Sequence, residues 1–345
     1  IAISQKIDIP DPVFWSSETP YMYIIKQQLL KSDSLIDLTA KSIALYDLQS
    51  ESESMKLNGN EFVLKGVVYY PSYESFGKLL NYDQMEHDIS LIKDAGFNCI
   101  RFAKSTIHPY YLSLCEKYGL LAFLEIPING IPSGIAEDES FVNRSKDFLL
   151  NYLSFYGDYS SFAAIGFGGT YLPQLSEHIS LVSTLANLTK EKSNLLTYAS
   201  FFGKNLKTIE KLDLYGLEFI GDEIVDSDEK IKELQNEFGK GKVFFSGCTY
   251  PVYLGNSDGY LNEFSYEAQA KYFEKLFDYI TQNKIPAFFI DSFADFQGDY
   301  SSFICGYNKT NLYHIGLLDV NRSKNRIDFP FFNNFFNFFI WMYAV

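Results

Sequence analysis

Residues 81–126 read NYDQMEHDISLIKDAGFNCIRFAKSTIHPYYLSLCEKYGLLAFLEI, and this stretch decides the fold. Asn81 is placed to cap a helix whose apolar residues recur at helical spacing. An apolar strand at 98–102, a second helix at 107–118 and a second strand at 120–126 follow. Strand and helix therefore alternate, which predicts parallel strands connected by helices.

The same alternation continues along most of the chain. Further strands are expected at 62–70, 162–168, 195–200, 213–219, 243–248 and 286–293. Eight strands alternating with helices over roughly 260 residues is typical of a (β/α)8 TIM barrel, and the predicted fold class is α/β. A doubly wound sheet is the alternative, but the sequence contains neither GxGxxG nor GxxxxGK[ST].

The regions on either side of the predicted barrel differ from it. Residues 1–58 contain short β-rich runs at 22–25 and 43–46, and they predict part of a β-sandwich, since so short a segment is too small for a domain of its own. The barrel is expected over 59–328. Residues 329–345 carry no charge and are rich in Phe, which predicts a C-terminal helix that is either the last core helix or a membrane-proximal one.

Composition limits the function classes. The 345 residues include 29 Lys and Arg against 43 Asp and Glu, a net charge of −14, which argues against binding to nucleic acid. The four cysteines form no CxxC pair and the four histidines are scattered. We therefore expect no metal site and no cofactor.

Polar and aromatic side chains follow several predicted strands, at the end where (β/α)8 barrels hold their functional residues. The candidate ligand-binding residues are Tyr69, Tyr70, Arg101, Glu125, Glu218, Asp291 and Asp295. Arg101 and Glu125 are expected to point inward. They could form an ion pair that supports the barrel mouth, or they could contact a ligand.

Several segments together resemble glycoside hydrolase family 2, the group of β-galactosidases, β-glucuronidases and β-mannosidases. The segments are FWSSETPYMY at 14–23, LNG at 57–59, LKGV at 64–67, DISLIK at 88–93, GFNCIR at 96–101, LCEKYGLL at 114–121, EIP at 125–127 and FADF at 293–296. The resemblance implies a TIM barrel preceded by part of an immunoglobulin-like domain.

The resemblance also implies retaining glycoside hydrolysis by two carboxylates about 5–5.5 Å apart. Thr170 stands at the position of the acid/base glutamate and Gly247 at that of the nucleophile. No Asp or Glu occurs between Lys240 and Asn256, so a small shift in the alignment does not restore the nucleophile. The family's Asn-Tyr-His on the first strand is Val-Tyr-Tyr at 68–70, and its last-strand Trp is Asp291.

The sequence thus predicts a family 2-like barrel without catalytic residues, acting as a glycan-binding or scaffolding module of a larger cell-envelope protein, periplasmic or extracellular. Its expected partners are carbohydrate and other protein segments or subunits, and a membrane through 329–345. One alternative is an active retaining β-glycosidase that uses relocated carboxylates among Glu125, Glu218, Asp291 and Asp295. Another is a membrane-tethered subunit whose barrel mainly contacts protein.

Overall fold

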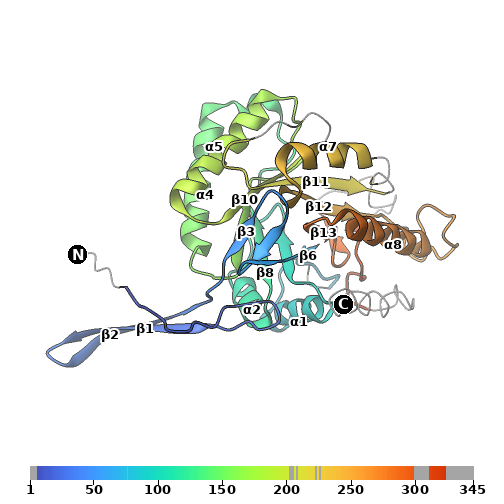
Figure 1. Cartoon of the computed structure of the whole chain (residues 1–345). Coiled ribbons are helices and arrows are strands. Elements are labelled where there is room, and N and C mark those ends of the chain that lie inside the picture. The colour runs from blue at the N-terminus through green and yellow to red at the C-terminus, as the bar shows by residue number, and fades with distance from the viewer. Residues whose placement is uncertain are drawn as a thin grey trace.

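The computed structural model describes residues 6–323 except 76, 202–205, 207–208, 222–223, 225–226 and 299–310. Eight parallel strands close into a barrel in the order β10-β11-β12-β13-β6-β7-β8-β9 (Figure 1). These strands are β6 (Leu64–Val68), β7 (Cys99–Phe102), β8 (Leu121–Glu125), β9 (Phe162–Gly166), β10 (Leu196–Phe201), β11 (Leu214–Ile220), β12 (Val243–Thr249) and β13 (Ala287–Asp291). The predicted (β/α)8 barrel is confirmed, and each expected strand is present to within a few residues.

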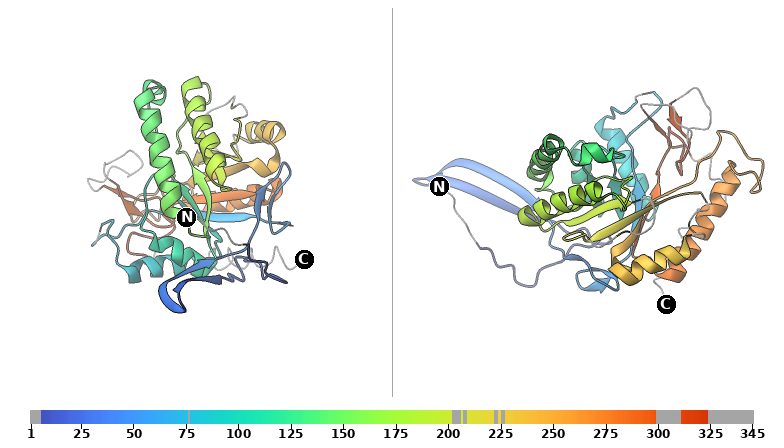
Figure 2. Two further views of the ribbon diagram at one scale, coloured as in Figure 1. Left: turned by 90° about the vertical axis from the view of Figure 1, so that its left-hand side faces the viewer. Right: turned by 90° about the horizontal axis from the view of Figure 1, so that it is seen from above.

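Helices lie outside the strands in Figures 1 and 2. They are α1 (Tyr82–Asp94), α2 (Tyr110–Tyr118), α3 (Ser133–Ala136), α4 (Glu139–Tyr156), α5 (Ser176–Lys192), α7 (Asp228–Phe238) and α8 (Tyr266–Asn283), with a 3₁₀ turn at Lys240–Lys242. The predicted cap of α1 is confirmed as a capping box, since the side chain of Asn81 accepts from the Gln84 amide and the side chain of Gln84 accepts from the Asn81 amide.

Aromatic side chains fill the inside of the barrel, and glycines on neighbouring strands make room for them. A Cβ atom at Gly66 would lie 2.3 Å from the ring of Phe289, and one at Gly166 would lie 2.3 Å from the ring of Tyr198. Buried side chains including Phe123 and Phe244 complete this inner layer. Among the described residues the inside of the barrel is therefore a packed core.

The strands predicted before the barrel are confirmed in part, since the run at 22–25 overlaps β1, and the assignment of residues 1–58 to part of a β-sandwich stays a prediction. β1 (Tyr23–Lys31) and β2 (Ser34–Ile43) form an antiparallel ribbon that projects from the barrel in Figures 1 and 2. The predicted run at 43–46 is wrong as a strand, because only its first residue belongs to β2. Ser32 and Asp33 have positive φ and make the tight turn, a signal that the sequence analysis did not use.

The segment before this ribbon is held against the barrel. Trp15 is buried and its amide donates to the carbonyl of Leu45. Ser17 donates to the carbonyl of Gly119 at 2.7 Å, and the ammonium of Lys93 donates to the carbonyl of Ser17 at 2.7 Å. The two bonds of Ser17 attach this segment to the C-terminal ends of α1 and α2.

Two smaller sheets complete the described structure. β3 (Leu48–Ser50), β4 (Met55–Leu57) and β5 (Asn60–Glu61) form an antiparallel sheet just before the barrel, and β14 (Phe296–Gln297) pairs with β15 (Leu312–Tyr313) after it. Residues 329–345 lie outside the described residues, so the C-terminal helix and the cell-envelope location stay predictions. Within the described part of the chain, no helix has the length and apolarity needed to span a membrane.

Candidate functional site

Four charged side chains meet at the C-terminal end of the barrel, which we call the mouth. Arg101 comes from β7, Glu125 from β8, Glu218 from β11 and Asp291 from β13. Parallel strands present their carboxyl ends at one edge, so residues far apart in sequence come together there. Glu125 and Arg101 are almost fully buried, whereas Glu218 has 14% of its side chain exposed.

All three nitrogens of the Arg101 guanidinium donate hydrogen bonds within the barrel. Nε and Nη2 donate to Oε2 of Glu125 at 3.0 and 2.8 Å, and Nη1 donates to the Ser246 carbonyl at 2.5 Å. Nη2 also lies 3.3 Å from Oε1 of Glu218. Burial lowers the pKa of Arg101, but Glu125, and with it Tyr198 and Glu218, raises this pKa well above its usual value. Arg101 therefore stays charged and binds two carboxylates at once.

Glu125 has further donors of its own. The amide of Lys104 donates to its Oε1 at 3.3 Å, and the hydroxyl of Tyr198 donates to its Oε2 at 3.3 Å. A buried carboxylate with this many donors is compensated by the protein itself. The predicted ion pair of Arg101 and Glu125 is thus present, and it supports the floor of the mouth.

Asp291 is the carboxylate at the mouth that protein groups satisfy least. Among the described residues its Oδ1, which is shielded from solvent, has no hydrogen-bond partner. Burial raises the pKa of Asp291 to about 6, and Glu218 adds to this, whereas Lys104, Arg101 and a hydrogen bond with Thr249 lower it. Asp291 therefore holds its proton to a higher pH than an ordinary aspartate does.

An aromatic stack forms one wall beside these carboxylates. The rings of Tyr70 and Phe296 are 4.1 Å apart, and those of Phe296 and Tyr313 are stacked at 4.9 Å with 6° between their planes. Burial, and then the charge of Asp291, raises the pKa of Tyr70 well above its usual value. Tyr70 therefore keeps its proton and presents a half-buried ring next to the charged groups.

Two glycines lie next to the same carboxylates. A Cβ atom at Gly247 would be 3.6 Å from Oδ2 of Asp291 and 3.7 Å from Cγ of Glu218. A Cβ atom at Gly169 would be 3.3 Å from Oε1 of Glu218. Thr170 follows with φ of 63°, and its hydroxyl donates to Oδ1 of Asn129 at 3.0 Å. Glu218 therefore lies beside both glycines.

Two of the predicted site residues lie elsewhere. Tyr69 is buried between the barrel and its helices, and its hydroxyl donates to Asp88 at 2.6 Å. Asp295 is buried and pairs with Nδ1 of His314 at 2.8 Å and with the amide of Gly316 at 2.9 Å. Both residues follow barrel strands, but their side chains serve packing and the connection after β13.

The sequence analysis missed three groups at the mouth. Ser200 donates to the hydroxyl of Ser246 at 2.8 Å, and the charge of Lys104 acts on Asp291. The two serines each stand two residues after an inward aromatic, Tyr198 and Phe244. Period-two alternation along β10 and β12 could have found them.

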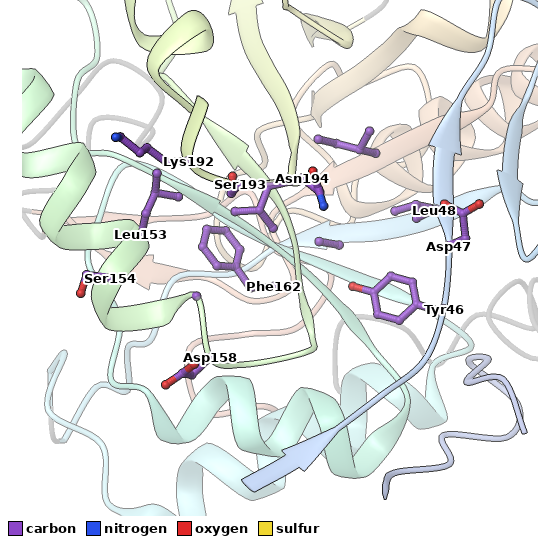
Figure 3. A pocket seen from close by; sticks show the side chains of 14 residues that line it. Tyr46, Asp47, Leu48, Leu153, Ser154, Asp158, Phe162, Lys192, Ser193 and Asn194 are labelled. Atoms are coloured by element: carbon purple, nitrogen blue, oxygen red, sulfur yellow. The ribbon is translucent and has the colours of Figure 1, made fainter. Parts of the chain in front are cut away.

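A separate hollow lies at the opposite end of the barrel. Its volume is about 650 Å³, and it lies between residues 46–48 and the starts of β9 and β10, where Tyr46, Leu153 and Phe162 line it (Figure 3). It contains none of the predicted site residues. The described residues also include no group of three or more His, Cys, Asp or Glu side chains that could hold a metal ion.

The closed barrel defines a (β/α)8 protein, and its charged side chains gather at the end of the strands where enzymes of this fold hold their active sites. Within that class, residues 48–147 match the family described as glycosyl hydrolases family 2, TIM barrel domain. This part of the chain is therefore similar to the TIM barrel domain of family 2, in agreement with the resemblance found in the sequence.

Curated relatives agree with this match. A β-galactosidase of Psychromonas ingrahamii is 33% identical over 116 residues, and one of Alteromonas mediterranea is 31% identical over 119 residues. These alignments cover 33% and 34% of this chain but only 11% of each relative. The chain thus matches about a tenth of the length of these relatives.

Solved structures extend the likeness to the whole barrel. A GH2 β-galacturonidase from Eisenbergiella tayi superposes with a TM-score of 0.83 at 19% identity, over 96% of this chain and 61% of that one. A β-D-glucuronidase from Dictyoglomus thermophilum gives 0.82 at 16% identity, over 91% and 57%. At these identities the likeness defines the fold, which family 2 glycosidases share.

Proposed function

We propose that this barrel binds a carbohydrate at its mouth and does not hydrolyse it by the family's two-glutamate route. The observation that carries the proposal is the pair of positions Thr170 and Gly247, where the resemblance expects the two glutamates. Threonine does not donate a proton to a leaving group near neutral pH, and glycine has no side chain.

Binding is supported by the groups that remain at the mouth. Sugar rings have apolar faces and hydroxyl edges, so sites for them combine aromatic side chains with hydrogen-bonding groups. Tyr70, backed by Phe296, supplies the ring, and Glu218 and Asp291 supply acceptors beside it. The family match of residues 48–147 supports the same class of ligand.

The direct test measures hydrolysis and binding on the same preparation. A panel of nitrophenyl β-glycosides reports turnover, and calorimetric titration with the matching methyl glycosides reports binding. We expect heat of binding for at least one sugar and no release of nitrophenol above a buffer blank. Turnover, or the absence of binding across the panel, would contradict the proposal.

Hydrolysis by relocated carboxylates is the second candidate, and one observation favours it. Glu218 and Asp291 both lie beside Gly247, so they approach one another across the place where the nucleophile would stand. Their environments also differ, since Arg101 contacts Glu218 while burial raises the pKa of Asp291 to about 6. Such a difference is typical of an acid and base pair.

Variants separate this candidate from the first. If Asp291 acted as the general acid and Glu218 as the nucleophile, Asp291→Asn and Glu218→Gln would each abolish turnover of an unactivated glycoside. Asp33→Asn, at the tip of the exposed β1–β2 ribbon, makes the same change as Asp291→Asn far from the mouth. Turnover that all three variants retain would point to a contaminating hydrolase.

A further inference from the structure

The kind of sugar that the mouth can bind depends on which of its hydrogen-bonding groups already have partners within the protein. Arg101 is 1% exposed, and each of its nitrogens already donates to Glu125, Glu218, Ser246 or Ser200. A carboxylate on a ligand would have to displace Glu125 or Glu218 to reach the guanidinium. Either exchange would leave a protein carboxylate without its partner, which is strongly unfavourable.

Lys104 is the other described cation whose charge acts at this mouth. Its amide donates to Glu125, and its charge lowers the pKa of Asp291. The two cations thus face three carboxylates, those of Glu125, Glu218 and Asp291. When the pH is above the pKa of Asp291, these described residues give the mouth a net charge of one negative unit.

The groups at the mouth whose hydrogen bonding the described residues leave incomplete are acceptors. Oδ1 of Asp291 has no partner among the described residues, although it is shielded from solvent. Glu218 keeps part of its side chain exposed at the mouth. A shielded carboxylate oxygen without a hydrogen-bond donor destabilises the protein. A ligand that donates a hydrogen bond to this oxygen removes that cost, and its binding is favoured accordingly.

We propose that the mouth selects an amino sugar over the corresponding neutral sugar and rejects the corresponding uronic acid, with the amino group donating to Asp291. This inference rests on the proposed carbohydrate function. An ammonium on a carboxylate is a charge-assisted hydrogen bond, roughly twice as strong as a neutral one. A uronate would place a fourth carboxylate beside three others, and like charges at short range repel.

The inference gives this chain a ligand of opposite charge to the one named for a protein of similar fold. One of them is a β-galacturonidase in complex with galacturonate, an anionic sugar. A shared barrel does not fix the ligand, because specificity depends on the side chains at the strand ends. Here the arginine that could meet an anion is committed to Glu125 and Glu218.

The test is a calorimetric titration of the whole chain at pH 7.5 and low salt with D-galactosamine, D-galactose and D-galacturonate, and with the three gluco counterparts. We expect the amino sugar of one series to bind about tenfold tighter than its neutral sugar, and its uronate to give no measurable heat. Asp291→Asn should bring the amino and neutral sugars to within about twofold of each other. Asp33→Asn should leave the order unchanged.

The outcomes distinguish the two proposals. A uronate that binds as tightly as the amino sugar, or equal affinity for all three sugars, overturns the inference and leaves carbohydrate binding intact. Failure of all six sugars to bind contradicts the proposed function itself, and the inference with it. The wild-type order decides the matter even if Asp291→Asn does not fold.

Discussion

Nη2 of Arg101 lies 2.8 Å from Oε2 of Glu125, and both side chains are almost completely buried. The pair connects β7 to β8, and through the Ser246 carbonyl it reaches β12 on the other side of the barrel. A buried pair of this kind is costly to break, because removing one partner leaves the other charge without compensation.

Glu125→Gln should therefore lower the free energy of unfolding by about 3–5 kcal/mol. Urea denaturation followed by circular dichroism measures this loss. Glu86→Gln is the matched control, since Glu86 pairs with exposed Lys117 and the loss of a solvent-exposed pair should cost much less than that of the buried one. Equal costs for the two variants would show that the buried pair has no special role.

The inward glycines give a second prediction on stability. Gly166→Ala would place Cβ 2.3 Å from the ring of Tyr198 and should destabilise the barrel by about 1–3 kcal/mol. Tyr198 contacts Glu125, so the strain should also disturb the mouth. Gly134→Ala is the control, because nothing lies within 4 Å of its Cβ and the change should be nearly neutral. A neutral Gly166→Ala would mean that the tyrosine has room to move.

The raised pKa of Asp291 predicts how the stability of the fold depends on pH. Its pKa is about 6 in the folded chain and ordinarily 3.8, so between these values the folded state binds more protons than the unfolded state. The contribution of Asp291 to the free energy of unfolding is therefore most favourable at low pH, and it is lost as the pH rises through about 6.

Asp291→Asn should consequently stabilise the chain at pH 7.5 by up to about 3 kcal/mol, since one pKa unit corresponds to about 1.4 kcal/mol. The gain should vanish below pH 4. Unfolding midpoints of the variant and the wild type across pH 4–8 measure it, with Asp33→Asn as the control. A gain that does not change with pH would contradict the shifted pKa.

Substitutions of Tyr70 test whether the aromatic wall contributes to sugar binding. Tyr70→Ala should weaken binding of the best sugar about tenfold, whereas Tyr70→Phe should keep most of the affinity because the ring remains. Phe155→Ala removes an exposed ring from the outer surface of α4 and should have no effect on binding. Unchanged affinity in Tyr70→Ala would remove Tyr70 from the site.

The sequence predicted the barrel well because its signals are local. The capping of α1 and the apolar strands at 98–102 and 120–126 need no tertiary information. The run at 22–25 predicted only the start of β1, and the rest of the β1–β2 ribbon was missed because nearly all of its residues are exposed and alternate poorly. Only the Ser32–Asp33 turn reveals it.

The site was harder to predict than the fold. Arg101 and Glu125 were expected to point inward and do so, but Tyr69 and Asp295 also follow barrel strands and turn away from the mouth. Whether a side chain after a strand faces the mouth depends on one residue of register. The partners of Arg101 on β11 and β12 lie more than a hundred residues away in sequence, and only the closed barrel brings them together.

The central claim is that this mouth holds a carbohydrate without the family's hydrolytic pair. The most direct measurement compares the wild type with the double variant Thr170→Glu/Gly247→Glu, which restores both carboxylates, on the nitrophenyl β-glycoside of the sugar that binds best. We predict that the wild type binds this sugar and releases no nitrophenol above the blank, and that the double variant gains measurable turnover. Turnover by the wild type that Asp291→Asn or Glu218→Gln abolishes would contradict the account and show an active glycosidase with relocated carboxylates.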